Sequence, residues 1–224
     1  ANAEIIDQAA QRGIKIIVID SDVNSSQVSC RIGTNNLQAG IKAAEAALAT
    51  DDEELYIGIV NYDVNSANGQ QRELGFRQTV EQDPRVKNIT TINVLSTTED
   101  ARAGAKEMLL SDSRINVVVT FNEWTSLGVG WAIRDLNRAD RIQVVAFDSN
   151  VVSVGMLETG EVDALIVQNP YAMGYLGVET AANLMNGQTG GPSVVDTATT
   201  IVTRENMYEP ESQKILFSFE EEGY

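Results

Sequence analysis

The segment QVVAFDSN, residues 143–150, is an apolar, β-rich run that stops at Asp148 and continues into two small polar residues. The segment KIIVIDSD, residues 15–22, repeats this pattern, with Asp20 followed by Ser21. In an open α/β sheet, ligands bind outside the carboxyl ends of the parallel strands, so a carboxylate at the end of a strand is placed to meet one. The echo predicts two similar halves that present Asp20 and Asp148 in similar ways.

From Leu55 onward, β-rich runs alternate with helical patterns. The runs are LYIGIVNY, NITTINVL, INVVVTF, IQVVAFD and VDALIVQ. This alternation indicates successive right-handed βαβ units, and therefore a parallel sheet covered by helices on both faces. Capping signals agree with it: Ser96 and Glu99 have the spacing of a capping box, Asn150 can cap the next helix, and Gly160 stands where that helix is expected to end.

Two lobes are predicted. Residues 51–169 contain a full set of strands and are expected to form a complete second lobe. Residues 1–50 hold a first helix, the strand that ends at Asp20, a weaker strand and an alanine-rich crossover helix, while residues 170–224 add a long helix, a final strand near 194–202 and a tail. These two segments are expected to pack together as a first lobe. With so few strands, that lobe is expected to be incomplete and to lack its initial βαβ units.

The composition argues against several classes of function. The formal net charge of −16 opposes direct binding of nucleic acid, because that affinity comes largely from Lys and Arg on phosphates. The absence of histidine removes the usual general base and triad partner, so an enzyme is the least favoured class and no cofactor is expected. No apolar run approaches the roughly 20 residues of a membrane span, so we expect no membrane insertion of this chain. The single cysteine, Cys30, is expected to be a buried packing residue.

Polar side chains at the ends of the predicted strands form the candidate binding site. A carboxylate accepts hydrogen bonds from two hydroxyls, an amide side chain both donates and accepts, and an arginine adds a rigid fork of donors. Such a set suits a polyhydroxylated small molecule, on whose apolar face a tryptophan could stack. Taken singly, each polar residue could equally be a helix cap or a turn residue. The candidate ligand-binding residues are Asp20, Ser21, Arg72, Asn122, Trp124, Asp148 and Gln168.

A calcium loop is a rival interpretation of the first aspartate. Asp20, Asp22 and Asn24 match the alternating ligands that open an EF-hand. The sixth position would be Ser25, where the turn requires glycine, and the twelfth would be Arg31, where a bidentate glutamate is required. We therefore expect no metal site there.

Several segments together resemble the ribose-type periplasmic sugar-binding proteins, whose type I periplasmic binding protein fold is shared by the effector domain of the lac-repressor family. They are IIVIDSDVNS, IGTNNLQAG, GQQRELGF, TFNEWTSLGVGWAI, VVAFDSN, IVQNPYAMGYLGVETAANLMNG and VTRENMY, in the expected order over essentially the whole chain. The resemblance implies two Rossmann-like lobes, joined by crossovers, that close on one sugar. It implies Asp20, Arg72, Asn122, Asp148 and Gln168 as hydrogen-bonding residues for the sugar, and a first lobe without its initial strands.

Two positions depart from the ribose-binding pattern. An arginine usually follows the first aspartate, and here Ser21 does; a stacking aromatic is usual near Thr97, and none is present. The resemblance therefore does not specify ribose, and Trp124 or Tyr62 is expected to supply the contact with the sugar ring.

The implied function is that of a periplasmic or extracellular solute-binding protein, secreted or lipid-anchored through an upstream segment. It would bind a monosaccharide or related polyol in the cleft between the lobes and deliver it to the permease of an ABC transporter. One alternative is the effector domain of a lac-repressor-type transcription regulator, which predicts a helix-turn-helix upstream of Ala1. Another is the sensing domain of a membrane receptor, which predicts a transmembrane segment nearby.

Overall fold

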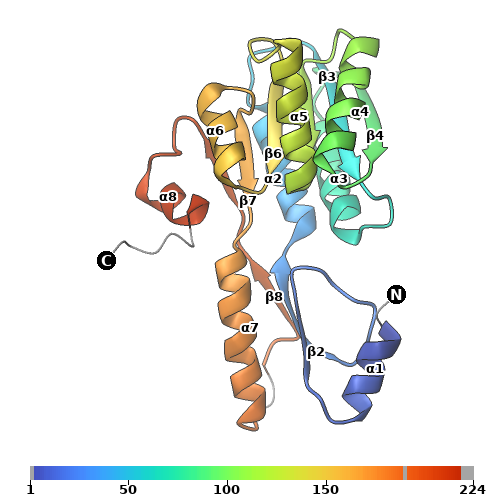
Figure 1. The fold of residues 1–224 in the computed structure, drawn as a ribbon, viewed down its shortest axis with the longest axis vertical. Helices are drawn as coiled ribbons and strands as arrows, with labels where there is room; N and C mark the ends of the chain where they lie inside the picture. The colour runs from blue at the N-terminus through green and yellow to red at the C-terminus, as the bar shows by residue number, and fades with distance from the viewer. Residues whose placement is uncertain (1–2, 189–190, 218–224) are drawn as a thin grey trace. The chain divides into compact units, whose positions relative to one another are not determined.

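A computed structural model describes residues 3–188 and 191–217 (Figure 1). The chain divides into two compact units: unit 1 is formed by Ala1–Asn35 and Gln168–Thr199, and unit 2 by Asn36–Val167 and Thr200–Tyr224. The chain therefore passes between the units three times. Each unit is an α/β structure with parallel strands, as the sequence predicts.

Unit 2 is built on a six-stranded sheet with the order β4-β3-β5-β6-β7-β9. The strands are β3 (Leu55–Tyr62), β4 (Val86–Val94), β5 (Val117–Thr120), β6 (Gln143–Phe147), β7 (Ala164–Val167) and β9 (Thr200–Thr203). All are parallel except β9, which pairs antiparallel with β7. The helices are α2 (Asn36–Leu48), α3 (Ala67–Val80), α4 (Thr98–Ser111), α5 (Glu123–Leu136), α6 (Val151–Thr159) and α8 (Pro210–Leu216).

Helices cover both faces of this sheet. Val117 and Val119 belong to the core cluster formed with α2 and α3, whereas Val118 between them belongs to the cluster formed with α4, α5 and α6. Alternate residues of one strand thus enter two different cores. This explains why the central strands read as continuous apolar runs, as strands buried on both faces do.

Unit 1 contains a three-stranded parallel sheet with the order β1-β2-β8. Its elements are α1 (Ala3–Gln11), β1 (Ile16–Ile19), β2 (Val28–Thr34), α7 (Pro170–Met185) and β8 (Val194–Thr197). Its small core joins β2 to α7 through Cys30, Ile32 and Met173. Cys30 is buried, which confirms its prediction as a packing residue.

The division of the chain differs from the predicted one in two places. The alanine-rich helix α2 belongs to unit 2, because its alanines pack beneath the sheet of that unit. The predicted final strand at 194–202 is two strands: β8 pairs with β2 in unit 1, and β9 pairs with β7 in unit 2. The tail follows β9, and Leu216 packs into the core of unit 2; the acidic end of the tail lies outside the described residues.

The predicted helix caps hold in one helix and shift in another. Asn150 caps α6 in a capping box with Ser153, and α6 ends at Gly160 with a left-handed φ of 91°, as expected. The cap of α4 is Thr97 rather than Ser96, since its hydroxyl accepts a hydrogen bond from the backbone N of Asp100 at 3.2 Å. Over residues 3–188 and 191–217, the structure contains no helix with the length and apolar character needed to cross a membrane.

Candidate functional site

The two aspartates of the sequence echo share an unusual backbone conformation. Asp20 follows β1 with a φ of 63°, and Asp148 follows β6 with a φ of 67°. The backbone N of each donates a 3.0 Å hydrogen bond to a carbonyl of the neighbouring strand, that of Ile32 for Asp20 and that of Ile166 for Asp148. Aspartate tolerates the left-handed region better than most residues. The repeated sequence is therefore a repeated structure, a parallel strand that ends on an aspartate at its carboxyl edge.

In unit 1, three predicted residues lie at the carboxyl ends of β1 and β2. The Ser21 hydroxyl donates to Asp20 Oδ2 at 3.3 Å, and both residues are exposed. Gln168 Oε1 accepts a 2.7 Å hydrogen bond from the hydroxyl of Thr34, the last residue of β2. Asp22, which the calcium reading would use as a ligand, instead forms an ion pair with Arg31 at 2.6 Å.

In unit 2, Arg72 joins the ends of two strands. Its side chain is buried, Nη1 donates to the carbonyl of Phe121 at 2.6 Å, and the guanidinium carbon lies 4.7 Å from the centre of the Phe147 ring. Phe121 directly precedes Asn122 and Phe147 directly precedes Asp148. The structure thus brings Arg72, Asn122 and Asp148 to one edge of the sheet.

Asn36, the first residue of α2, is a further hydrogen-bond partner of the guanidinium. Asn36 Oδ1 accepts from Arg72 Nε at 2.8 Å. Asn36 is not among the residues predicted from the sequence. The signal for it was the pair Asn35-Asn36, two polar residues directly after a strand and at the start of a helix.

Asn122 caps a helix, which is the structural role that the sequence left open as the alternative to ligand binding. Its Oδ1 accepts from the backbone N of Thr125 at 2.9 Å and so caps α5, while its Nδ2 donates to the Ser96 hydroxyl at 2.7 Å. Trp124, two residues after this cap, is 49% exposed. Its indole ring therefore lies on the surface at the start of α5, where a ligand has access to it.

Ser126 is a second residue that sequence reasoning missed. It is buried, and its hydroxyl oxygen lies 2.7 Å from the carbonyl of Asn122 and 2.9 Å from both the backbone N and the carbonyl oxygen of Phe147. This hydroxyl therefore links the end of β6 to the start of α5. It thereby fixes the backbone of Phe147, from which Asp148 follows. Its only signal is a small polar residue inside an otherwise apolar helix.

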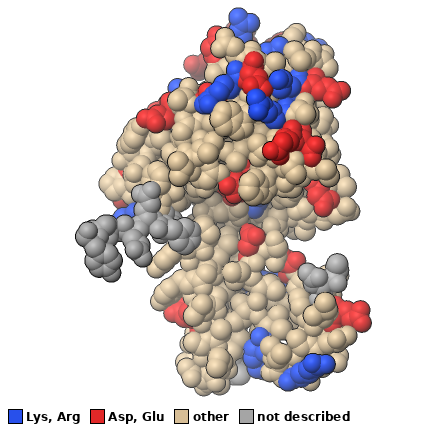
Figure 2. Space-filling model, viewed as in Figure 1, with Lys and Arg blue, Asp and Glu red and all other residues tan. Residues whose placement is uncertain are grey.

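Surface ion pairs of unit 2 lie away from this edge of the sheet. Arg102 and Lys106 on α4 hold the pKa of Asp135 at about 2, and Asp135 stands at the carboxyl end of α5, opposite the end that Asn122 caps. Figure 2 shows acidic and basic side chains interspersed on the face of unit 2 that carries α4 and α5. These charges stabilise the surface and are not part of the candidate site.

In parallel α/β sheets, ligands bind outside the carboxyl ends of the strands, and the polar side chains described above lie at those ends. Residues 1–189 match the model of the periplasmic binding protein domain, and the chain belongs to that family. This confirms the family that the sequence motifs indicate.

Two curated relatives are import or sugar-binding proteins. The chain is 25% identical over 211 residues to the D-ribose/D-allose-binding protein of Pseudomonas aeruginosa, covering 89% of this chain and 65% of the relative. It is 25% identical over 187 residues to the ribose import binding protein of Haemophilus influenzae, covering 80% of this chain and 61% of the relative. The chain therefore spans less than two thirds of the length of these relatives.

Solved structures of carbohydrate-binding proteins have the same fold. A carbohydrate transporter solute-binding protein from Agrobacterium radiobacter, in complex with D-arabinose, matches with a TM-score of 0.90 and 28% identity over 96% of this chain and 74% of that one. The periplasmic component of an ABC-type sugar transport system from Hahella chejuensis matches with a TM-score of 0.85 and 29% identity over 91% of this chain and 74% of that one.

Proposed function

We propose that this chain is part of an extracytoplasmic solute-binding protein that binds a monosaccharide or a related polyol and delivers it to the permease of an ABC transporter. The observation that carries the proposal is the convergence of Arg72, Asn122 and Asp148 at the carboxyl edge of the unit 2 sheet. The names of the relatives, which include ribose, allose and arabinose binders, support a sugar as the ligand class.

Each residue has a proposed part in binding. Asp148 accepts hydrogen bonds from sugar hydroxyls through its carboxylate, and the guanidinium of Arg72 donates to a hydroxyl or to the ring oxygen. The Asn122 amide has donor capacity beyond its bond to Ser96. Trp124 offers an exposed ring for stacking on the apolar face of the sugar. In unit 1, the proposed contacts are made by Asp20, Ser21 and Gln168.

Binding in this proposal involves no chemical conversion of the sugar. The protein would work outside the cytoplasm, in the periplasm or at the cell surface. Its partners would be the sugar and the membrane permease, without nucleic acid.

A ligand screen tests the proposal. The full product of the gene is titrated calorimetrically with a panel of pentoses, hexoses and polyols, because the relatives are longer than this chain. We expect micromolar or tighter binding of at least one monosaccharide. If no sugar or polyol of the panel binds, the proposed function is wrong.

A further inference from the structure

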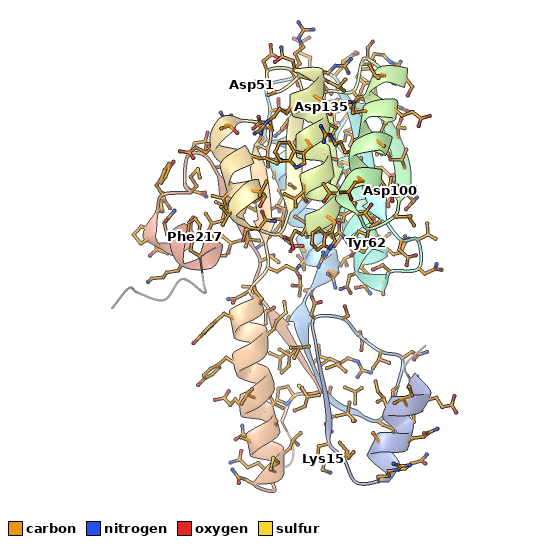
Figure 3. The ribbon with its side chains drawn as sticks, in the orientation of Figure 1. Lys15, Asp51, Tyr62, Asp100, Asp135 and Phe217 are labelled. Atoms are coloured by element: carbon orange, nitrogen blue, oxygen red, sulfur yellow. The ribbon has the colours of Figure 1, made fainter. Side chains whose placement is uncertain are left out.

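Helix α7 of unit 1 is apolar on two opposite sides. One side packs on the sheet: Met173 belongs to the small core with β2, and a Cβ at Gly177 would lie 3.2 Å from the side chain of Ile19 in β1. Tyr171 and Tyr175 lie two residues before and two residues after Met173, and two residues rotate a helix by about 200°. Both tyrosines therefore point away from the sheet. Figure 3 shows side chains of α7 projecting to that side as well as toward the strands.

The side of α7 that points away from the sheet carries a continuous apolar stripe. Its members are spaced alternately by four and three residues, which is the pattern by which one helix packs along another. All are exposed, and Val178 in the middle is 73% exposed. A helix that is apolar on both sides is normally covered on both. The members of this α7 stripe are Tyr171, Tyr175, Val178, Ala182 and Met185.

The direction of the α7 stripe limits what can cover it. In a layered α/β unit, further strands extend the sheet sideways, and further helices lie beside α7 in its own layer. Neither reaches the side of α7 that points away from the sheet. A partner of the α7 stripe therefore comes from outside unit 1.

The composition of α7 suits an interface between proteins. Tyrosine and methionine are enriched at such interfaces, and charged residues are depleted from their centres. Within Pro170–Met185 the only charged residue is Glu179, whereas the whole chain has a formal net charge of −16. A large net charge keeps copies of a protein apart in solution. Helix α7 offers them a surface with little of that charge.

We propose that α7 pairs in an antiparallel arrangement with α7 of a second copy of this chain. The rings of Tyr171 and Tyr175 then lie against smaller side chains, those of the partner's Ala182 and the partner's Val178. A parallel pair would put tyrosine against tyrosine and alanine against alanine, which fills the space between the helices less evenly. The antiparallel arrangement also opposes the two helix dipoles.

The available area fits a weak dimer. The rings of Tyr171 and Tyr175 are stacked with their centres 6.5 Å apart, and each tyrosine is more than half exposed. At the area usual for a large aromatic side chain, the two supply roughly 200–300 Å² per copy. The smallest specific interfaces bury roughly 500 Å² per partner. Val178 and Ala182 add to the area of the rings, so we expect a dissociation constant of about 10–100 μM.

Sedimentation equilibrium of the full product of the gene, from about 1 to about 500 μM, tests the proposal. We expect the mass to rise from that of a monomer to that of a dimer over this range. A mass that stays that of a monomer at the highest concentration would overturn the proposal. The pairing is independent of sugar binding, so its failure would leave the proposed function untouched.

Two variants of equal charge test whether the α7 stripe is the interface. Val178→Glu places a carboxylate in the middle of the stripe and should raise the dissociation constant at least about tenfold, because pairing would bury the charge. The exposure of Val178 leaves the core of the monomer unaffected. Asn183→Glu adds the same charge at an exposed position of α7 outside the stripe and should dimerise as the wild type does. A Val178→Glu variant that dimerises like the wild type would contradict the assignment.

Cross-linking locates the paired helices. Cys30 is the single cysteine of the chain and is buried, so Val178→Cys introduces an accessible thiol. Val178 lies near the middle of α7, where an antiparallel pair brings the two copies of one residue closest together. A short bismaleimide should therefore join two copies of Val178→Cys, but not two copies of Asn183→Cys. Equal cross-linking of the two variants, or none in Val178→Cys, would refute the antiparallel pairing of α7.

Discussion

The substitution Gly75→Ala tests the packing of α2 against α3, which holds Arg72 in place. A Cβ at Gly75 would overlap the carbonyl oxygen of Leu37 and would lie 3.0 Å from the carbonyl carbon of Leu37 and 3.2 Å from the backbone N of Ile41. Gly40 makes the reciprocal contact, since a Cβ there would overlap the carbonyl oxygen of Arg72. These obstacles are backbone atoms of a buried helix, which cannot move aside as a flexible side chain can.

The expected effect follows from two opposing terms. Overpacking of a core costs up to about 3 kcal/mol, and the higher helix propensity of alanine returns about 1 kcal/mol. The net loss in the free energy of unfolding is about 2 kcal/mol, and for a chain of this length it corresponds to a fall of about 4–8 °C in Tm.

A matched glycine provides the control. Gly155 lies inside α6 and a Cβ there would meet no atom within 4 Å, so Gly155→Ala should raise stability by about 0.5–1 kcal/mol. Tryptophan fluorescence during thermal unfolding is the assay, because Trp124 and Trp131 both belong to α5 in unit 2. A Gly75→Ala variant as stable as the wild type would refute the close backbone contact between α2 and α3.

Three further substitutions test single interactions in unit 2. Asn122→Ala removes the cap of α5 and should lower the free energy of unfolding by about 0.5–2 kcal/mol in urea titrations; an unchanged value would mean that the cap contributes nothing. Arg72→Lys cannot reproduce the guanidinium fork and should cost about 1–3 kcal/mol by the same measurement, whereas wild-type stability would show that the buried contacts of Arg72 are dispensable. Asp135→Asn should lower Tm at pH 7, and the difference from the wild type should close as the pH falls from about 4 to about 2. The reason is that Arg102 and Lys106 lower the pKa of Asp135 to about 2, so its stabilising charge is present above its unfolded pKa near 3.8 and is lost below. A difference in Tm that does not vary with pH would exclude this ion pair as its source.

The sequence predicted the sheet of unit 2 well because its strands are buried on both faces. Continuous apolar runs such as 144–147 have few alternatives in an α/β chain, and the polar residues that end them could be placed at the carboxyl edge from the pattern alone. The echo between Asp20 and Asp148 proved to be structural, since both residues have a left-handed backbone and the same bond to a neighbouring strand.

The features that the sequence did not reveal depend on contacts between distant residues. An alanine-rich helix such as α2 can pack against almost any surface. Its close packing in unit 2 depends on Gly40 of α2, which contacts the backbone of α3, and on Gly75 of α3, which contacts the backbone of α2. The run 194–202 has no strong breaker, so the change of sheet between β8 and β9 has no local signal. Ser126 resembles any small residue in a helix until the backbone of Phe147 is seen beside it.

The most direct test of the account is the affinity of the gene's full product for its best sugar, measured by calorimetry for the wild type and for Asp148→Asn. Asparagine tolerates the left-handed backbone at this position and keeps the shape of the side chain, so the variant removes mainly the charged acceptor. We predict a loss of about 10- to 100-fold in affinity, or about 1.5–3 kcal/mol, while Glu107→Gln, a control on the exposed surface of α4, binds as the wild type does. Equal affinities of Asp148→Asn and the wild type would contradict the assignment of Asp148 to a sugar site.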